Sequence, residues 1–268
     1  MKVNLGDIEE TLLIPLWGRA KFTQEYPSFL NDQKAVELVE QIEYDFPRLD
    51  KTLPESFNLL HATRAKQFDD KIRAYIAQHP KASIINLGAG LDTAFYRIDN
   101  GTINWYDLDL PAVINIRREL LPEPERATYI SDSLFNQTWF TEVKNTENGV
   151  FMIVAGVLMY FEESRIRPFF ISLANSFPRS EIVFDSQSRF GKLIGNWVLR
   201  RVGMKGSPTK WTLKDARRFT EWDRRIDVLD QFPLFKNISR DAVWDTAFKR
   251  SMNFMDRSGI RNVCHLRV

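Results

Sequence analysis

The stretch SIINLGAGLDTAFYRID, which runs from Ser83 to Asp99, decides the fold. It joins an apolar run to a turn of small residues and then to a segment compatible with a helix. Glycine adopts the positive φ angles of tight turns, and its lack of a side chain lets a ligand approach the backbone. We therefore predict a buried strand, a ligand-contacting turn at Gly88, Ala89 and Gly90, and a helix after it.

Strand and helix patterns alternate on both sides of this stretch. Residues 55–79 carry apolar side chains at helical spacing and stop before Pro80, which predicts a long helix. Buried strand patterns follow in INWYDLDLP, ATYIS, GVFMIVAGVLMY and EIVFDS, with helix patterns between them. The tail adds the strand candidates RIDVLD and RNVCHLRV around a helix predicted near residues 242–254. This order predicts an α/β fold with a mainly parallel sheet.

The chain of 268 residues is long enough for one full-sized core, and no proline- or glycine-rich linker divides it. We predict a single domain, residues 1–268, with four parts. These are a helical cap at 1–55, a ligand-binding core at 56–186, a lid at 187–214, and strands with a helix at 215–268. The lid segment holds seven basic residues and no acidic one. This composition suits a lid that attracts an anionic ligand, and the alternative is a solvated helix with one buried side.

The composition excludes several classes of protein. The formal net charge is only +2, so nothing indicates a nucleic-acid or membrane partner. Cys264 is the single cysteine, which rules out an internal disulfide and fits a reducing compartment. The N-terminal segment has a short apolar run preceded by acidic residues, so we expect no secretory signal and a cytoplasmic protein. His61, His79 and His265 are scattered, so we expect no metal site.

Open parallel sheets bind ligands beyond the carboxyl ends of their strands. The residues at the ends of the predicted strands are therefore the candidates for the site: Gly88, Ala89, Gly90, Asp107, Asp109, Leu110, Ser131, Asp132, Ser133, Ala155 and Gly156. Asp109 lies 21 positions after Gly88, close to the spacing of an acid that binds ribose hydroxyls. Asp109 could instead cap the helix that begins at Pro111, and Asp132 could bind an adenine amine or cap the turn after it.

The glycine turn differs from a dinucleotide fingerprint. GAGLDT lacks the third glycine, and Thr93 stands in its place. Asp92 brings a negative charge to the helix start where a pyrophosphate would sit, although it could simply stabilise the helix dipole. The pattern therefore favours a cofactor that has a ribose and an adenine but no phosphate.

Arg64 is the unusual residue of the helix predicted at 55–79. Leu60 and Phe68 lie four positions before and after it in the apolar stripe, and no acid lies three or four positions away. A buried guanidinium needs an anionic partner. Arg64 therefore either extends its charged end to solvent or binds a carboxylate of the cofactor.

Five segments, taken in order and with their spacing, resemble the leucine carboxyl methyltransferase superfamily: TLLIPLWGRA, HATRAKQFDD, NLGAGLDTAFYR, WYDLDLPAVINIRRELL and VAGVLMYF. The resemblance covers about residues 11–190. Within the superfamily, the chain resembles the tetracenomycin-type polyketide O-methyltransferases more closely than the leucine carboxyl methyltransferases. Leucine carboxyl methyltransferases usually carry a glutamate where this chain has Ala155. The resemblance implies a Rossmann-like class I fold that uses S-adenosylmethionine, with a seven-stranded sheet and a reversed last strand.

The resemblance also implies roles for individual residues. Arg64 would bind the methionine carboxylate of the cofactor, and Gly88 and Gly90 would lie along its methionyl and ribose part. Asp109 would bind the ribose hydroxyls. The adenine amine would contact Asp132 with help from Ser133.

We expect methyl transfer from S-adenosylmethionine to an oxygen of a small anionic acceptor. A carboxylate acceptor suits the chain because it is already ionised and needs no general base, and Tyr160 could orient it. A nicotinamide-dependent oxidoreductase is an alternative that would use the same glycines and Asp109. A non-catalytic protein that binds the cofactor is a second alternative, supported by Ala155.

Overall fold

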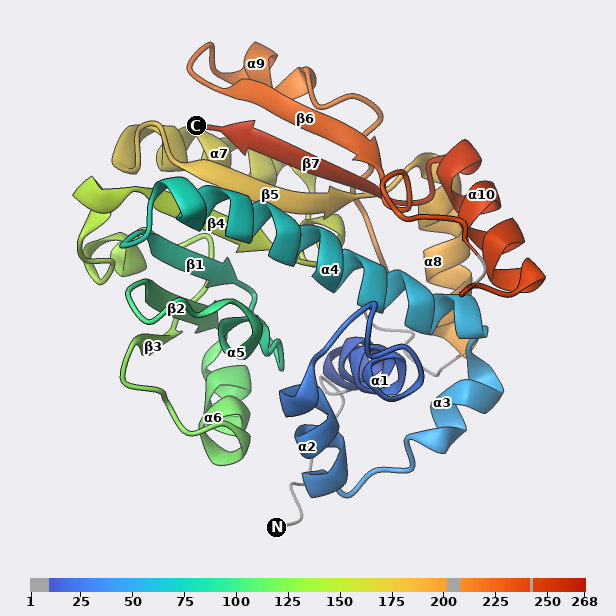
Figure 1. Ribbon diagram of the computed structural model, residues 1–268. Coiled ribbons are helices and arrows are strands. Elements are labelled where there is room, and N and C mark those ends of the chain that lie inside the picture. The colour runs from blue at the N-terminus through green and yellow to red at the C-terminus, as the bar shows by residue number, and fades with distance from the viewer. Residues whose placement is uncertain (1–9, 202–207, 242) are drawn as a thin grey trace.

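The computed structural model describes residues 10–201, 208–241 and 243–268. They form one sheet with the order β3-β2-β1-β4-β5-β7-β6 (Figure 1). Its strands are β1 (Ser83–Leu87), β2 (Asn104–Asp109), β3 (Ala127–Ser131), β4 (Val150–Val154), β5 (Glu181–Ser186), β6 (Asp227–Pro233) and β7 (Asn262–Arg267). β7 runs antiparallel to β5 and β6, and the other neighbouring strands are parallel. The predicted α/β class and the mostly parallel seven-stranded sheet are confirmed.

The described residues also form the helices α1 (Glu10–Glu25), α2 (Gln33–Gln41), α3 (Pro47–Thr52), α4 (Glu55–Gln78), α5 (Ala94–Ile98), α6 (Pro111–Leu120), α7 (Glu163–Ser176), α8 (Arg189–Arg201), α9 (Arg218–Trp222) and α10 (Thr246–Ser258). A short 3-10 helix, η3 (Leu158–Tyr160), follows β4. No helix among the described residues has the length and apolar character needed to cross a membrane.

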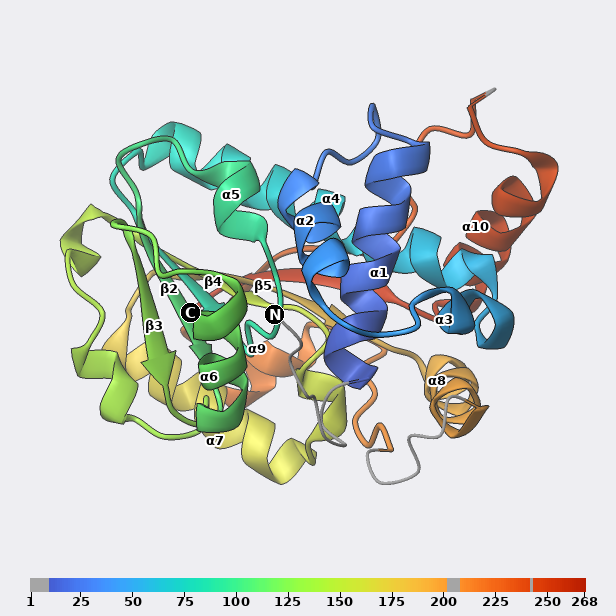
Figure 2. The same ribbon diagram turned by 90° about the horizontal axis from the view of Figure 1, so that it is seen from below.

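Helices cover both faces of the sheet. In Figure 2, α4 and α5 lie on one side of the strands and α7 lies on the other. β1 and β4 are buried at every position, which explains why their sequences are continuous apolar runs. Successive side chains of a strand point to opposite faces, so Ile84 packs in the layer of α4 and Ile85 in the layer of α7.

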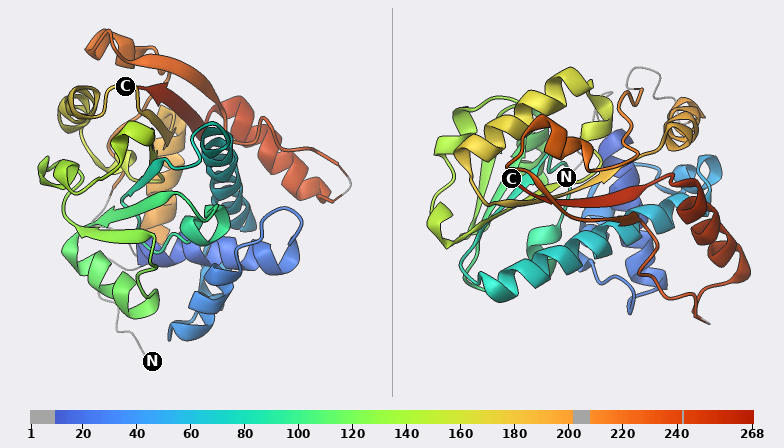
Figure 3. Two further views of the ribbon diagram at one scale, coloured as in Figure 1. Left: turned by 60° about the vertical axis from the view of Figure 1, so that its left-hand side comes forward. Right: turned by 90° about the horizontal axis from the view of Figure 1, so that it is seen from above.

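The helices α1, α2 and α3 occupy the segment predicted as a cap, and α1 packs against α2 and α4 (Figure 3). Asp32 is the N-cap of α2, and its carboxylate accepts a hydrogen bond of 3.1 Å from the Ala35 amide. The same buried carboxylate pairs with Arg19 of α1 at 3.0 Å and with Arg97 of α5 at 2.6 Å. One acidic side chain therefore joins the cap to the core.

The helix predicted near 242–254 lies slightly later in the chain. Asp245 accepts a hydrogen bond of 2.7 Å from the Phe248 amide, so α10 begins at Thr246. Gly259 ends it with a φ of 58°. Position 242 lies outside the described residues.

Candidate functional site

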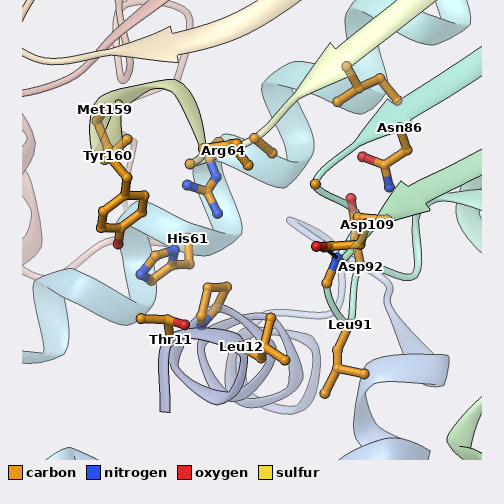
Figure 4. A pocket seen from close by; sticks show the side chains of 18 of the residues that line it. Thr11, Leu12, His61, Arg64, Asn86, Leu91, Asp92, Asp109, Met159 and Tyr160 are labelled. Atoms are coloured by element: carbon orange, nitrogen blue, oxygen red, sulfur yellow. Dashed lines mark hydrogen bonds between the residues drawn. The ribbon is translucent and has the colours of Figure 1, made fainter. Parts of the chain in front are cut away.

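A cavity of about 460 Å³ lies at the carboxyl edge of the parallel strands, under α1 and α8. Small-molecule sites commonly have this size. The lining contains these predicted site residues: Arg64, Gly88, Ala89, Gly90, Asp109, Leu110, Asp132, Ser133, Ala155, Gly156 and Tyr160. Asp107 and Ser131 were also predicted, but they lie within β2 and β3 and are not among the described residues that line the cavity. Figure 4 shows Arg64, His61 and Tyr160 towards one end of the cavity and Asp109 towards the other.

The glycine turn after β1 forms one wall of the cavity. Gly88 has a φ of 72° and Gly90 a φ of 50°, which disfavours other residues. A Cβ atom at Gly88 would lie 2.5 Å from Val157 Cγ2, and one at Gly90 would lie 3.0 Å from Leu12 Cδ2. Both glycines therefore allow a tight turn and close packing beneath the cavity.

Asp92 is held at the start of α5. Its carboxylate accepts a hydrogen bond of 3.1 Å from the Ala94 amide and lies 3.5 Å from Arg97. Burial alone would raise the pKa of Asp92, but Arg97 and Arg19 lower it below its ordinary value. A negative charge thus occupies the region where a pyrophosphate would bind, in agreement with a cofactor that lacks phosphate.

Asp109 has both carboxylate oxygens in use and remains partly exposed to the cavity. Its oxygens accept hydrogen bonds from the Gly90 amide at 2.8 Å and the Leu110 amide at 2.7 Å. Among the described residues no side chain caps α6, so Asp109 is not the helix cap that the sequence allowed. Burial raises the pKa of Asp109, although the two amide donors lower it. Each carboxylate oxygen still has a lone pair for a ribose hydroxyl.

Asp132 adopts the turn-capping arrangement that the sequence left open. Its carboxylate accepts hydrogen bonds from the Ser133 amide at 2.7 Å, from Asn136 at 2.5 Å and from the Thr138 hydroxyl. Burial acts to raise the pKa of Asp132. The hydrogen bonds from Thr138 and Asn136 outweigh this effect, so the pKa lies below its ordinary value. An adenine amine would therefore share this carboxylate with the turn.

Three of the predicted residues contribute small or apolar surface. The Ala89 amide donates to the Leu108 carbonyl at 3.1 Å. Leu110 is 51% exposed at the rim of the cavity. Ala155 directly follows β4 and places only a methyl group where a glutamate would place a carboxylate.

Arg64 is buried, so it does not extend to solvent as one alternative required. Its Nη1 atom lies 3.5 Å from Asp185 Oδ2, a carboxylate at the end of β5. The other oxygen of Asp185 accepts a hydrogen bond of 2.5 Å from the Gly156 amide. Gly156 has a φ of 75°, and a Cβ atom there would overlap Arg64 Nη1. The glycine therefore leaves room for the guanidinium.

Arg261, which lies just before β7, also lines the cavity and was not predicted from the sequence. Its Nη1 atom lies 3.6 Å from the same Asp185 oxygen and donates to Met159 Sδ at 2.9 Å. Two guanidinium groups thus share one carboxylate at the cavity wall. The acid at the end of the apolar run EIVFDS was a signal for Asp185, whereas no local pattern marks Arg261.

His61 was also missed as a site residue, although it lies one helical turn before Arg64 and lines the cavity. Its Nδ1 atom is buried and has no hydrogen-bond partner within the part of the chain that the structure describes. Burial, followed by the charges of Arg64, Arg261 and Arg19, holds the pKa of His61 well below its ordinary value. The ring is therefore neutral at neutral pH. Burial also raises the pKa of Tyr160, which keeps its hydroxyl protonated.

α8 supplies the first half of the segment predicted as a lid. Gly195, Val198 and Leu199 on its inner side line the cavity. Leu193 and Trp197 on its outer side are 69% and 51% exposed. Residues 202–207 of the predicted lid lie outside the described part of the chain. Whether this segment moves as a lid stays a prediction.

Two solved structures share the fold. A DUF574 family protein from Streptomyces avermitilis superposes with a TM-score of 0.61 at 11% identity, covering 83% of this chain and 88% of that one. A methyltransferase candidate from Thermobifida fusca gives a TM-score of 0.59 at 11% identity, covering 84% of this chain and 88% of that one. At this identity the likeness concerns the fold alone.

Sequence relatives identify the family. The tetracenomycin polyketide synthesis O-methyltransferase of Streptomyces glaucescens is 29% identical over 69% of this chain and 67% of its own length. An S-adenosyl-L-methionine-dependent methyltransferase of Gibberella zeae is 30% identical over 81% of this chain and 78% of its own length. Residues 13–173, more than half of the chain, match the leucine carboxyl methyltransferase family. These matches decide against an oxidoreductase and against a non-catalytic protein. The chain belongs to the leucine carboxyl methyltransferase family and is an S-adenosylmethionine-dependent methyltransferase.

Proposed function

We propose that the protein methylates a carboxylate oxygen of a small acid, such as a polyketide-like acid. The supporting observation is the surplus of positive charge beside the cavity, where Arg64 and Arg261 share the single carboxylate of Asp185. Buried cations call for anionic partners, and a carboxylate acceptor supplies one. The polyketide synthesis O-methyltransferase among the sequence relatives supports an oxygen as the acceptor atom and a polyketide-like compound as the acceptor.

The residues around the cavity fit S-adenosylmethionine. We propose that Arg64 pairs with its methionine carboxylate, because a charge-assisted hydrogen bond to a guanidinium is a strong one. Gly88 and Gly90 would lie along the methionyl and ribose part. Asp109 would accept hydrogen bonds from the ribose hydroxyls, and Asp132 with Ser133 would contact the adenine amine.

The cofactor, when bound, supplies a methyl group already activated on a sulfonium sulfur. The chain then has to hold the acceptor oxygen in line with that methyl group and exclude water. A carboxylate is ionised at neutral pH, so no side chain has to remove a proton. Tyr160 keeps its proton and would donate a hydrogen bond that orients the acceptor.

The test is methyl transfer from radiolabelled S-adenosylmethionine to aromatic acids, with the matched amides and phenols as comparison. We expect a methyl ester, which mild base hydrolyses, from the acids alone. A base-stable methyl ether formed from the phenols, with no label on the acids, would contradict the proposal.

A further inference from the structure

We propose that Arg261 binds the carboxylate of the methyl acceptor, in a subsite that also contains His61 and Tyr160. This assignment rests on the proposed function, because it names the residue that recognises the acceptor. Figure 4 shows His61 and Tyr160 at the end of the cavity away from Asp109, where an acceptor would approach the methionyl part of the cofactor.

Most of the hydrogen-bonding capacity of Arg261 is unused by the residues that the structure describes. A guanidinium has five N–H donors. The recorded contacts are a donation to the thioether of Met159, which is a weak acceptor, and a separation of 3.6 Å from Asp185, which exceeds a normal hydrogen bond. The side chain lines the cavity and keeps 15% of its surface exposed. Its free donors are therefore available to a ligand.

The two arginines at this end of the cavity carry more positive charge than Asp185 neutralises, so one guanidinium is left to pair with the acceptor. Arg64 and Arg261 contribute two positive charges, and Asp185 contributes one negative charge. At its methionine end the cofactor carries a carboxylate and an ammonium group, which offset each other, and a sulfonium that adds a positive charge. At least one positive charge thus remains at this end of the cavity, and an acceptor carboxylate neutralises it.

Arg261 rather than Arg64 faces the acceptor end. Arg64 packs on the turn at Gly156, which directly follows β4. Arg261 instead contacts Met159, the neighbour of Tyr160, and among nearby charges it has the larger influence on the pKa of Tyr160. The neutral ring of His61 adds a polar group at this end without a second charge.

Apolar side chains that line the cavity would bind the apolar part of the acceptor. Ile14 of α1, Phe57 of α4 and Val198 of α8 line the same cavity. An acid with an apolar or aromatic body would bury that body against them while its carboxylate contacts Arg261. A charged acid with a flat apolar body is therefore the appropriate probe.

The experiment is calorimetric titration of protein saturated with S-adenosylhomocysteine, using 1-naphthoate and the uncharged 1-naphthamide. We expect naphthoate to bind about tenfold more tightly than naphthamide. Arg261→Met should remove this preference and leave the affinity for S-adenosylhomocysteine unchanged. Arg225→Met, which removes an exposed arginine paired with Asp223, is the matched control and should behave like the wild type.

Equal affinity of the wild type for the two probes would overturn the assignment, as would an Arg261→Met variant that retains the preference. If Arg261→Met does not fold, Arg261→Lys replaces it. Lysine lacks the planar fork, so naphthoate affinity should fall several-fold, and an unchanged affinity contradicts the proposal. Arg261-dependent binding of naphthoate, combined with methylation of hydroxyl groups only, would uphold this subsite and contradict the proposed function instead.

Discussion

Asp185 organises the charged residues around the cavity. Its side chain is 1% exposed and lies against the Gly156 amide and the guanidinium groups of Arg64 and Arg261. The unusual position of Arg64 in an apolar stripe was visible in the sequence, because a buried cation without a helical partner stands out. Its partner was not predictable, since Asp185 lies 121 positions later and only the sheet brings the two together.

We expect Arg64→Ala to weaken binding of S-adenosylmethionine by tenfold or more, because the loss of a hydrogen bond to a charged group costs about 1.5–3 kcal/mol. Calorimetric titration of the purified variant measures this change. An affinity equal to that of the wild type would exclude Arg64 from the cofactor site.

Gly156→Ala tests the same guanidinium without removing it. An added methyl group would overlap Arg64 Nη1 and displace it, so cofactor affinity should fall about tenfold. Gly101→Ala is a matched control, because Gly101 also has a positive φ, of 82°, but an added Cβ atom there would meet no described atom within 4 Å. If both variants lose affinity equally, backbone strain rather than displacement of Arg64 is the cause.

At the scale of helices and strands, the sequence predicted most elements correctly. The buried parallel strands are continuous apolar runs, and this pattern identified them. Element boundaries were less certain, since local side-chain contacts set them. Asp245 and Gly259 fix the ends of α10, whereas the apolar pattern alone placed the helix earlier.

At Gly191, α8 packs closely against the backbone of Ile260. A methyl group at this position would overlap the carbonyl oxygen of Ile260. Gly191→Ala should therefore lower the free energy of unfolding by about 1–3 kcal/mol, as overpacking does. Gly195→Ala lies on the same helix, where the nearest atom would be 3.8 Å away, and should leave the stability equal or slightly higher. Urea denaturation of both variants measures the difference, and equal destabilisation would contradict this packing.

Asp32 joins three helices, so its removal should affect the whole cap. Asp32→Asn breaks buried pairs with Arg19 and Arg97, and we expect a loss of about 3 kcal/mol in the free energy of unfolding. Glu37→Gln on the same helix breaks an exposed pair with Lys34 and should cost less than about 1 kcal/mol. Urea denaturation compares the two, and similar losses would show that Asp32 does not join the cap to the core.

For the molecule as a whole, Asp32 makes stability depend on pH. Burial acts to raise the pKa of Asp32, but Arg97 and Arg19 lower it below the ordinary value of 3.8. A carboxyl group with a lowered pKa stabilises the folded state above its unfolded pKa and loses this effect as the pH falls. We expect wild-type stability to drop below about pH 4, and the drop to be smaller in Asp32→Asn.

The stability of the wild type has to be compared with that of Asp32→Asn, because other buried acids have a raised pKa and so change the stability with pH in the opposite direction. Burial raises the pKa of Asp69 and Asp107. Asp107 pairs with Arg117, which Asp32 does not contact, so its contribution is common to the wild type and the variant and cancels in the difference. Asp69 shares Arg97 with Asp32, so its contribution belongs to the same charge cluster. Parallel stability curves between about pH 6 and pH 3 would contradict the assignment to Asp32.

The reversed direction of β7 brings a residue from the last part of the chain to the edge of the sheet that carries the cavity. Because β7 runs against β5, its beginning lies at the ligand-binding edge, and Arg261 reaches the cavity from the last part of the chain. The segment that carries the family match ends at residue 173, before both Asp185 and Arg261. Under the role proposed for Arg261, a lineage could change its acceptor through substitutions near the end of the chain while residues 13–173 still match the family. Relatives that agree over the first two thirds need not methylate the same compound.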